Sequence, residues 1–198
     1  MSFFLTPAPA SPALQRLLDE DVAQMGFEMN GTHLWAYQPE TLASLFELLG
    51  ATKRAGDLSM RELGILVTAT ASTLGDSYCS LAWGMKFSEM AGVDTAAGVL
   101  SGDDSELTEA EAIMADWARS VVRDPNGTTQ ADVDRLREAG FGDAQIFAVT
   151  TFVALRLAFS TVNDALGARP DADLREIVPN AVQEVVTWGR AVEGDAAP

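Results

Sequence analysis

The 198-residue sequence predicts an all-α fold. Apolar residues recur at helical spacing in nearly every segment, and these segments begin at Ser, Thr, Asp or Pro and end at Gly, as helices do. No segment combines the alternating pattern of a strand with a hairpin turn. Because 47% of the residues are hydrophobic, the chain can bury one sizeable core. We therefore expect a single domain over residues 1–198, with a core at about 12–190 and about eight helices.

The first half of the chain is expected to hold four helices. Proline is tolerated in the first helical turn, so Ser11-Pro12 and Pro39-Glu40 each begin a helix. The segment from Gly26 to Gln38 is expected to be a loop. Ser59 and Glu62 form a capping-box pattern that begins the third helix. The four helices are expected at about 12–25, 39–49, 59–74 and 76–90.

The second half is expected to hold four more helices. Asp94 begins only a short helical turn, and a second capping box, Thr108 with Glu111, begins the next helix. The longest apolar stretch, Ile146 to Phe159, is interrupted by Arg156. Because this stretch is too short and too polar to span a bilayer, we expect a buried core helix. The four helices are expected at about 108–122, 129–138, 143–166 and 174–190.

The balance of charged residues limits the partners of the protein. Thirteen basic and 29 acidic residues give a net charge of −16, which repels phosphate backbones and anionic lipid. We therefore expect no nucleic-acid partner and no membrane partner. The single cysteine excludes an internal disulfide and fits a reducing compartment, and the first residues lack the basic region of a signal peptide. A cytoplasmic location is expected.

The sequence gives no support for a metal or another cofactor. One cysteine and one histidine, His33, cannot supply the usual zinc ligand sets, and no glycine-rich phosphate motif is present. Asp103, Asp104 and Glu106 offer oxygen ligands, but they lack the spacing of a calcium loop. We expect these three carboxylates to form a solvated acidic loop.

The segment 75–84 holds the most distinctive chemistry. Cys79 follows Gly75 at a predicted helix start, where free backbone N–H groups and the helix dipole favour a thiolate. Asp76, Cys79 and Trp83 are spaced so that they share one helix face. Asp76 can accept the thiol proton, but its negative charge opposes thiolate formation, so the net effect on the thiol pKa stays open. A lone cysteine is also often a small buried hydrophobe.

Three further groups are weaker candidates. Glu62 either moves protons or only caps its helix, and Tyr78 either donates a hydrogen bond to a bound oxygen or only packs. Trp83 has the alternative role of a core aromatic residue. For an anionic substrate, Arg61 or Arg156 offers a cation.

These residues lie in segments that resemble the AhpD-like or carboxymuconolactone decarboxylase superfamily, in particular its peroxidase-related members. The resemblance is carried by Arg61-Glu62-Leu63, by 74–79 and by 107–111, and it extends over about Leu14 to Gly167. It implies an all-helical protein that forms homo-oligomers, as dimers, trimers or hexamers. Predicted helices that are apolar on most sides favour the same expectation, because such surfaces are buried in a core or between subunits.

Redox members of this superfamily use a Cys-x-x-Cys-x-x-x-His motif at a helix start. Laid on this chain, the second cysteine falls on Cys79, the first on Asp76 and the histidine on Trp83, while Glu62 is similar to the family's helix-start glutamate. A cysteine pair is therefore absent. The resemblance implies a cycle in which Cys79 becomes a sulfenic acid and an external thiol restores it.

Three functions stay open at this point. The first is an AhpD-like peroxidase, an antioxidant oxidoreductase of the alkylhydroperoxidase or peroxiredoxin type, in which Cys79 reacts with a small hydroperoxide and Asp76 or Glu62 accepts a proton. The second is a cofactor-free lyase of the decarboxylase type acting on a small organic acid. The third is a non-catalytic helical oligomer. The first requires a reachable and easily ionised Cys79, and the third predicts a buried Cys79 without a cavity beside it.

Overall fold

The computed structural model describes residues 3–195, and all regular secondary structure in this range is helical, which confirms the all-α class. It contains eleven helices: α1 (Pro12–Met25), α2 (Asn30–Trp35), α3 (Pro39–Gly56), α4 (Met60–Leu74), α5 (Ser77–Ala91), α6 (Val93–Ser101), α7 (Glu109–Arg123), α8 (Gln130–Glu138), α9 (Asp143–Ala165), α10 (Leu174–Ile177) and α11 (Asn180–Val185).

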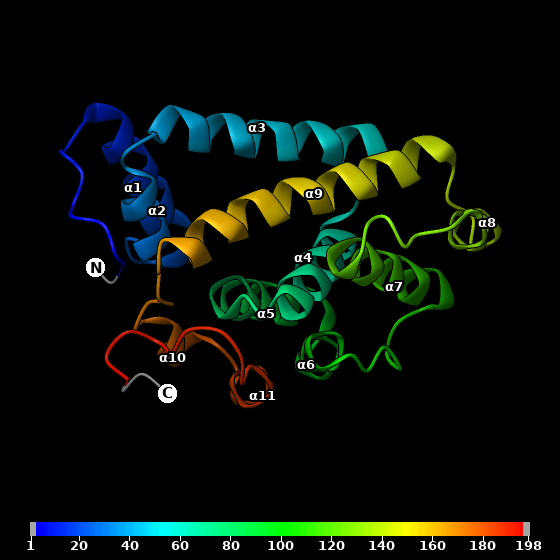
Figure 1. Cartoon of the computed structure of the whole chain (residues 1–198). Helices are drawn as coiled ribbons and strands as arrows, with labels where there is room; N and C mark the ends of the chain where they lie inside the picture. Colours follow the sequence, from blue (N-terminus) through cyan, green and yellow to red (C-terminus); the bar gives the residue numbers. More distant parts are fainter. Residues whose placement is uncertain (1–2, 196–198) are drawn as a thin grey trace.

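The longest helix, α9, runs across the molecule and organises the fold (Figure 1). It packs against α3 on one side and against α4 and α7 on the other. α4 is central, since it also contacts α5 and α6, and its residues from Leu63 to Ala71 are all buried. This burial agrees with the prediction that the third helix is apolar on most sides.

The sequence signals for helix ends act as expected around α4 and α7. The Glu62 carboxylate accepts hydrogen bonds from the N–H and the hydroxyl of Ser59, while the Ser59 hydroxyl accepts one from the N–H of Glu62. Thr108 and Glu111 form the same capping box at the start of α7. Gly75 ends α4 with a φ of 83°, a left-handed conformation that glycine adopts without strain. Both predicted capping boxes are thus confirmed.

The predicted loop between Gly26 and Gln38 instead contains the short helix α2. Distant contacts stabilise α2, because its first residue donates a backbone hydrogen bond to Asp171 and Trp35 donates one to the side chain of Asn163. Local sequence patterns carry no signal of such partners. The predicted short turn after Asp94 is likewise a helix of nine residues, α6.

The predicted helix over 174–190 is wrong, because it is divided into α10 and α11. Pro179 has no N–H and forces the residue before it out of the helical conformation, and Val178 is indeed extended with a ψ of 129°. After α11 the chain crosses the start of α5 without helical structure. There the Ser77 hydroxyl donates to the carbonyl of Arg190, and the Trp188 indole donates to the Ser80 hydroxyl.

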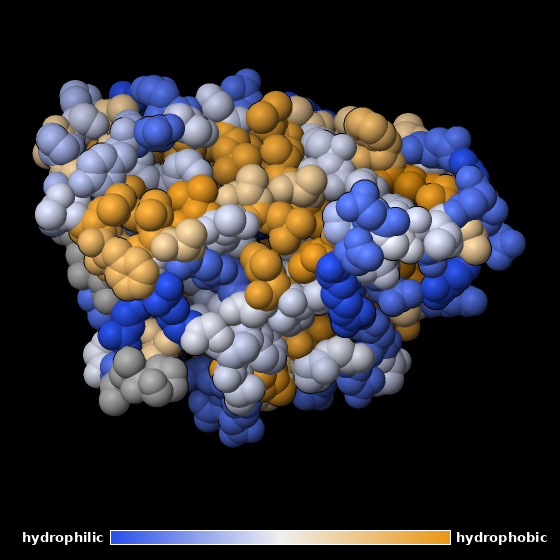
Figure 2. All heavy atoms as spheres, viewed as in Figure 1, coloured by the Kyte–Doolittle hydropathy of each residue, from blue (hydrophilic) through white to orange (hydrophobic). Residues whose placement is uncertain are grey.

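The environment of α9 is that of a core helix. By length and composition alone, it is the one helix among the described residues that is long and apolar enough to cross a membrane. Its polar residues Arg156, Ser160 and Asn163 are nevertheless buried among neighbouring helices, as the prediction of a core helix requires. Hydrophobic side chains also gather on the outer face over α3 and α9 (Figure 2). The exposed large hydrophobic residues of these two helices are Phe46, Leu48 and Phe147. Self-association of the chain remains a prediction.

Candidate active site

A cavity of about 640 Å³ lies between the N-terminal helices and the centre of the fold. Its walls come from α1, α2, α3, α5 and α9, so segments far apart in the sequence meet there. α5 contributes five residues and α9 contributes two. These are Tyr78, Cys79, Ala82, Trp83, Lys86, Arg156 and Phe159.

Cys79 occupies the first turn of α5. Asp76 is the N-cap residue of this helix, and one of its carboxylate oxygens accepts a hydrogen bond from the N–H of Cys79 at 2.9 Å. Cys79 is only 3% exposed, yet its side chain lines the cavity. The sulfur is therefore shielded from bulk solvent but faces a space that can hold a small molecule.

Two groups of α9 meet the sulfur of Cys79. Nη2 of Arg156 donates a hydrogen bond to Sγ at 3.2 Å, and the hydroxyl of Ser160 donates one at 3.7 Å. The guanidinium of Arg156 also lies 5.1 Å from the ring centroid of Phe159 and 5.8 Å from that of Trp83. Arg156 is 4% exposed, so a buried cation is held against both the thiol and aromatic rings.

The surroundings of Cys79 favour the thiol over the thiolate. Burial raises the pKa of the Cys79 thiol far above its usual range, and the negative charge of Asp76 raises it further. The positive charge of Arg156 lowers the pKa but does not offset the other two effects. The helix start therefore does not give an easily ionised thiol, because burial and the charge of Asp76 outweigh its effect.

Asp76 retains an acceptor next to the thiol. The residue is fully buried, and its second carboxylate oxygen has no hydrogen-bond partner in the described part of the chain. The unpaired oxygen makes Asp76 a suitable acceptor for the proton of Cys79.

A second carboxyl, Asp164, is affected by the charge of Asp76. Burial raises the pKa of Asp164 to about 7, and the negative charge of Asp76 raises it as well.

Tyr78 has its hydroxyl fully engaged. The hydroxyl donates to Asp171 and accepts a hydrogen bond from the N–H of Gly31 at 3.1 Å. Burial raises the pKa of Tyr78 well above its usual value, and burial likewise raises the pKa of Asp171 to about 6. Tyr78 lines the cavity with its ring, but its proton is directed at Asp171 and away from a ligand.

Glu62 and Arg61 lie outside the lining of the cavity. Glu62 is bonded to Ser59 in the capping box, and the guanidinium of Arg61 pairs with Glu111 at 2.6 Å. Of the two arginines that the sequence offers as cations for an anionic substrate, only Arg156 reaches the cavity. Trp83, the residue at the position of the motif histidine, lines it beside Cys79.

Sequence reasoning missed Lys86, Phe159 and Ser160 as residues of this site. Their spacing carries the signal, since Lys86 lies seven residues after Cys79 and Ser160 lies four residues after Arg156, so each pair shares a helix face. A single arginine inside an otherwise apolar helix is a further signal, because buried arginine requires a partner.

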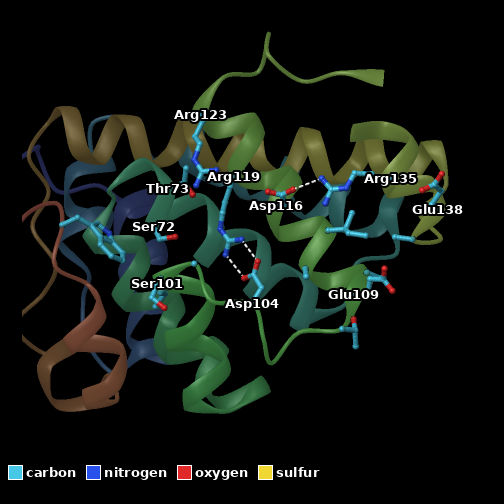
Figure 3. Close-up of a pocket in the computed structure, with 18 residues that line it drawn as sticks. Ser72, Thr73, Ser101, Asp104, Glu109, Asp116, Arg119, Arg123, Arg135 and Glu138 are labelled. Carbon is cyan, nitrogen blue, oxygen red and sulfur yellow. Dashed lines mark hydrogen bonds and ion pairs between the residues drawn. The ribbon is translucent and has the colours of Figure 1, made fainter. Parts of the chain in front are cut away.

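A second hollow, wider and more open, lies along α7 and α8 and has a volume of about 1230 Å³ (Figure 3). Its buried arginine, Arg119, forms two hydrogen bonds of 2.6 and 2.8 Å with Asp104, and Arg135 pairs with Asp116 at 3.0 Å. These cations are thus neutralised within the wall. Among the described residues, no group of three or more His, Cys, Asp or Glu side chains is arranged to hold a metal ion.

No family model matches the chain, and no curated protein matches it by sequence. Solved structures do match it. An uncharacterised peroxidase-related protein from Ralstonia eutropha, described as an alkylhydroperoxidase AhpD core, has a TM-score of 0.76 at 20% identity, covering 87% of this chain and 94% of its own. A peroxidase-related protein from a Silicibacter species has a TM-score of 0.74 at 19% identity, covering 87% and 93%.

The debrominase Bmp8 is similar over a comparable length. Its TM-score is 0.72 at 16% identity, and the match covers 91% of this chain and 96% of that chain. Bmp8 has also been solved as a cysteine-to-alanine variant in complex with 2,3,4-tribromopyrrole. At such identities the likeness concerns the fold, and it agrees with the resemblance that the sequence motifs indicate. The chain therefore has the AhpD-like helical fold.

Proposed function

We propose that the protein is a thiol-dependent oxidoreductase that reduces a small organic hydroperoxide, with Cys79 as its only redox residue. The observation that carries this proposal is that Cys79 lines a cavity, with its sulfur bonded to Arg156 and its N–H bonded to Asp76. A nucleophile needs a proton acceptor and a group that stabilises its anion, and these two residues supply both.

The reaction begins with transfer of the Cys79 proton to Asp76, while Arg156 stabilises the thiolate. The thiolate attacks the terminal oxygen of the hydroperoxide, so an S–O bond forms and the O–O bond breaks. The alkoxide that leaves takes a proton and becomes an alcohol, and Cys79 becomes a sulfenic acid. One external thiol then releases water and forms a mixed disulfide, and a second external thiol restores Cys79.

The raised pKa of Cys79 determines the pH dependence of this cycle. Because the thiolate is the nucleophile, the rate of sulfenic acid formation rises with pH above neutrality. When a bound substrate displaces water from the cavity, Arg156 is the main group that stabilises the negative charge on the sulfur. The cavity meets the requirement for a reachable Cys79, but the requirement for an easily ionised thiol is not met, so we expect a slow reductase.

A second candidate function is thiol-dependent debromination of a small aromatic compound. The aromatic walls of the cavity, Trp83 and Phe159, and the likeness to a debrominase favour it. In this reaction a C–Br bond becomes a C–H bond and bromide leaves. Cys79 and one external thiol supply the two electrons and form a disulfide. The named structural neighbours give no support to the lyase alternative.

The experiment that tests the main proposal follows consumption of cumene hydroperoxide with dithiothreitol as the reductant. The expected result is turnover by the native protein, loss of turnover in Cys79→Ser, and dimedone labelling of Cys79 after one equivalent of hydroperoxide. Ser88→Ala, a change of a buried α5 serine outside the cavity lining, serves as the control. Equal turnover in Cys79→Ser would refute the proposal. Bromide release from 2,3,4-tribromopyrrole without hydroperoxide turnover would instead favour the second candidate.

A further inference from the structure

Two cations line the cavity without a carboxylate partner. Lys86 Nζ and Arg156 Cζ each lie 5.8 Å from the ring centroid of Trp83. Within the described residues, no carboxylate oxygen lies at ion-pair distance from either of them. Arg156 is buried and Lys86 is partly buried, and basic side chains are rarely buried without a partner.

The hollow of Figure 3 provides the contrast. Its buried arginine, Arg119, is paired with Asp104 through two hydrogen bonds, so the charge of this arginine is neutralised within the fold. Arg156 is buried more deeply, yet among the described residues only its Nη2 has a hydrogen-bond partner, which is the sulfur of Cys79. Its Nε has no hydrogen-bond partner in the described structure. Leaving donors of a buried guanidinium unpaired is costly unless a ligand completes them.

The acidic groups around the cavity do not supply this ligand. Asp21 accepts a hydrogen bond from the N–H of Met29 at 3.1 Å, and Glu40 pairs with Arg16 at 3.5 Å on the exposed rim. Glu20 is exposed to solvent. The charges of Asp21 and Glu89 attract Lys86 only from beyond ion-pair distance. The interior of the cavity therefore has a positive wall beside its aromatic surface.

We propose that Lys86 and Arg156 form an anion subsite, and that the cavity takes a small aromatic carboxylate. The flat apolar part of such a molecule packs against Trp83 and Phe159, and its carboxylate accepts hydrogen bonds from Lys86 and from the part of the Arg156 guanidinium that lines the cavity. The identification of this carboxylate as part of the substrate rests on the proposed function. Binding of the carboxylate to the cavity does not depend on that function.

The test compares benzoate with benzamide, which has nearly the same shape but no charge. Isothermal titration calorimetry is carried out on the Cys79→Ser protein, in which hydroperoxide reduction is absent, so the outcome is independent of the proposed function. Benzoate is expected to bind at least tenfold more tightly than benzamide. Lys86→Gln is expected to remove this preference. The control is Lys53→Gln. Lys53 is the only other lysine of the chain and lies outside the cavity lining, so this variant is expected to retain the preference for benzoate.

A second measurement locates the bound anion. In the native protein, benzoate is expected to slow the alkylation of Cys79 by iodoacetamide, and benzamide at the same concentration is not. Equal binding of the two probes would overturn the proposal. Binding of benzoate without protection of Cys79, or an equal loss in Lys53→Gln and Lys86→Gln, would overturn it as well.

Discussion

The guanidinium of Arg156 lies 3.2 Å from the sulfur of Cys79, although the two residues are 77 positions apart in the chain. This contact joins α9 to the start of α5 and gives the buried thiol a cation. Burial and Asp76 oppose ionisation of the thiol, so Arg156 is the group that makes the thiolate attainable. The chemistry of the site therefore depends on a residue from outside the cysteine segment.

Replacing Arg156 by glutamine is expected to raise the pKa of the Cys79 thiol further. The variant loses the positive charge while glutamine retains hydrogen-bonding capacity. At fixed pH, the rate of alkylation by iodoacetamide falls about tenfold for each unit by which the pKa rises. Alkylation rates across pH 7–10 measure this effect. Arg61→Gln, which removes an arginine paired with Glu111, is the control and should leave the rate unchanged.

Replacing Asp76 by asparagine is expected to separate ionisation from turnover. Asparagine retains an oxygen that caps α5 but has no negative charge, so the pKa of Cys79 falls and alkylation at neutral pH becomes faster. Hydroperoxide reduction becomes slower because the variant lacks the carboxylic acid that returns the Cys79 proton to the leaving alkoxide. Parallel changes in the two rates would contradict the assigned role of Asp76.

Removing the carboxylate of Glu62 is expected to lower stability through the helix cap. Glu62→Ala breaks the hydrogen bonds to the N–H and hydroxyl of Ser59 and should lower the free energy of unfolding by about 1 kcal/mol. Urea unfolding measures the change. Glu106→Ala, on the exposed loop before α7, should leave the midpoint nearly unchanged. Equal midpoints for the two variants would show that the cap contributes little.

Asp164 is expected to make the folded protein less stable as pH rises from about 4 to about 7. Its pKa is raised to about 7 in the folded state from an ordinary value of 3.8, so the folded state binds more protons between these values. Stability falls with pH where the folded state holds the extra proton. Asp164→Asn removes this loss, and its advantage in melting temperature over the native protein should grow from pH 4 to pH 7.

The comparison at each pH isolates this one carboxyl. Groups whose pKa is lowered in the folded state have the opposite effect on stability as pH rises. Glu111, whose pKa is lowered by Arg61, is an example. Such groups act equally in both proteins and cancel in the difference. Glu184→Gln, on the exposed side of α11, is the matched control. A constant difference in melting temperature across the pH range would contradict the prediction.

Local patterns were sufficient to predict most helices, because caps and breaks act within a few residues. The capping box of Ser59 and Glu62 and the end of α4 at Gly75 are examples. The α2 helix was not predictable in this way, since its partners Asp171 and Asn163 lie more than a hundred residues away. Pro179 carried a clear local signal for a break, which outweighs the apolar periodicity around it.

The candidate site was predictable only in part for the same reason. The pattern around Cys79 placed Asp76, Tyr78 and Trp83 at one helix start, and the structure brings these residues to the thiol or the cavity wall. The pKa of the thiol depends on burial and on α9, which no spacing within α5 reveals. By sequence, Glu62 fits both the role of a proton carrier and the role of a helix cap. Only its hydrogen bonds show that Ser59 occupies its carboxylate.

The segment that crosses the start of α5 has a consequence for the newly made chain. Ser77 is bonded to Arg190, which follows it by 113 residues, and Ser80 is bonded to Trp188. At a synthesis rate of about 5–20 residues per second, the ribosome adds Arg190 on the order of ten seconds after Ser77. Until α9 has been added, the sulfur of Cys79 lacks its contacts with Arg156 and Ser160. The shielded state of the thiol is therefore reached only after most of the described residues have been synthesised.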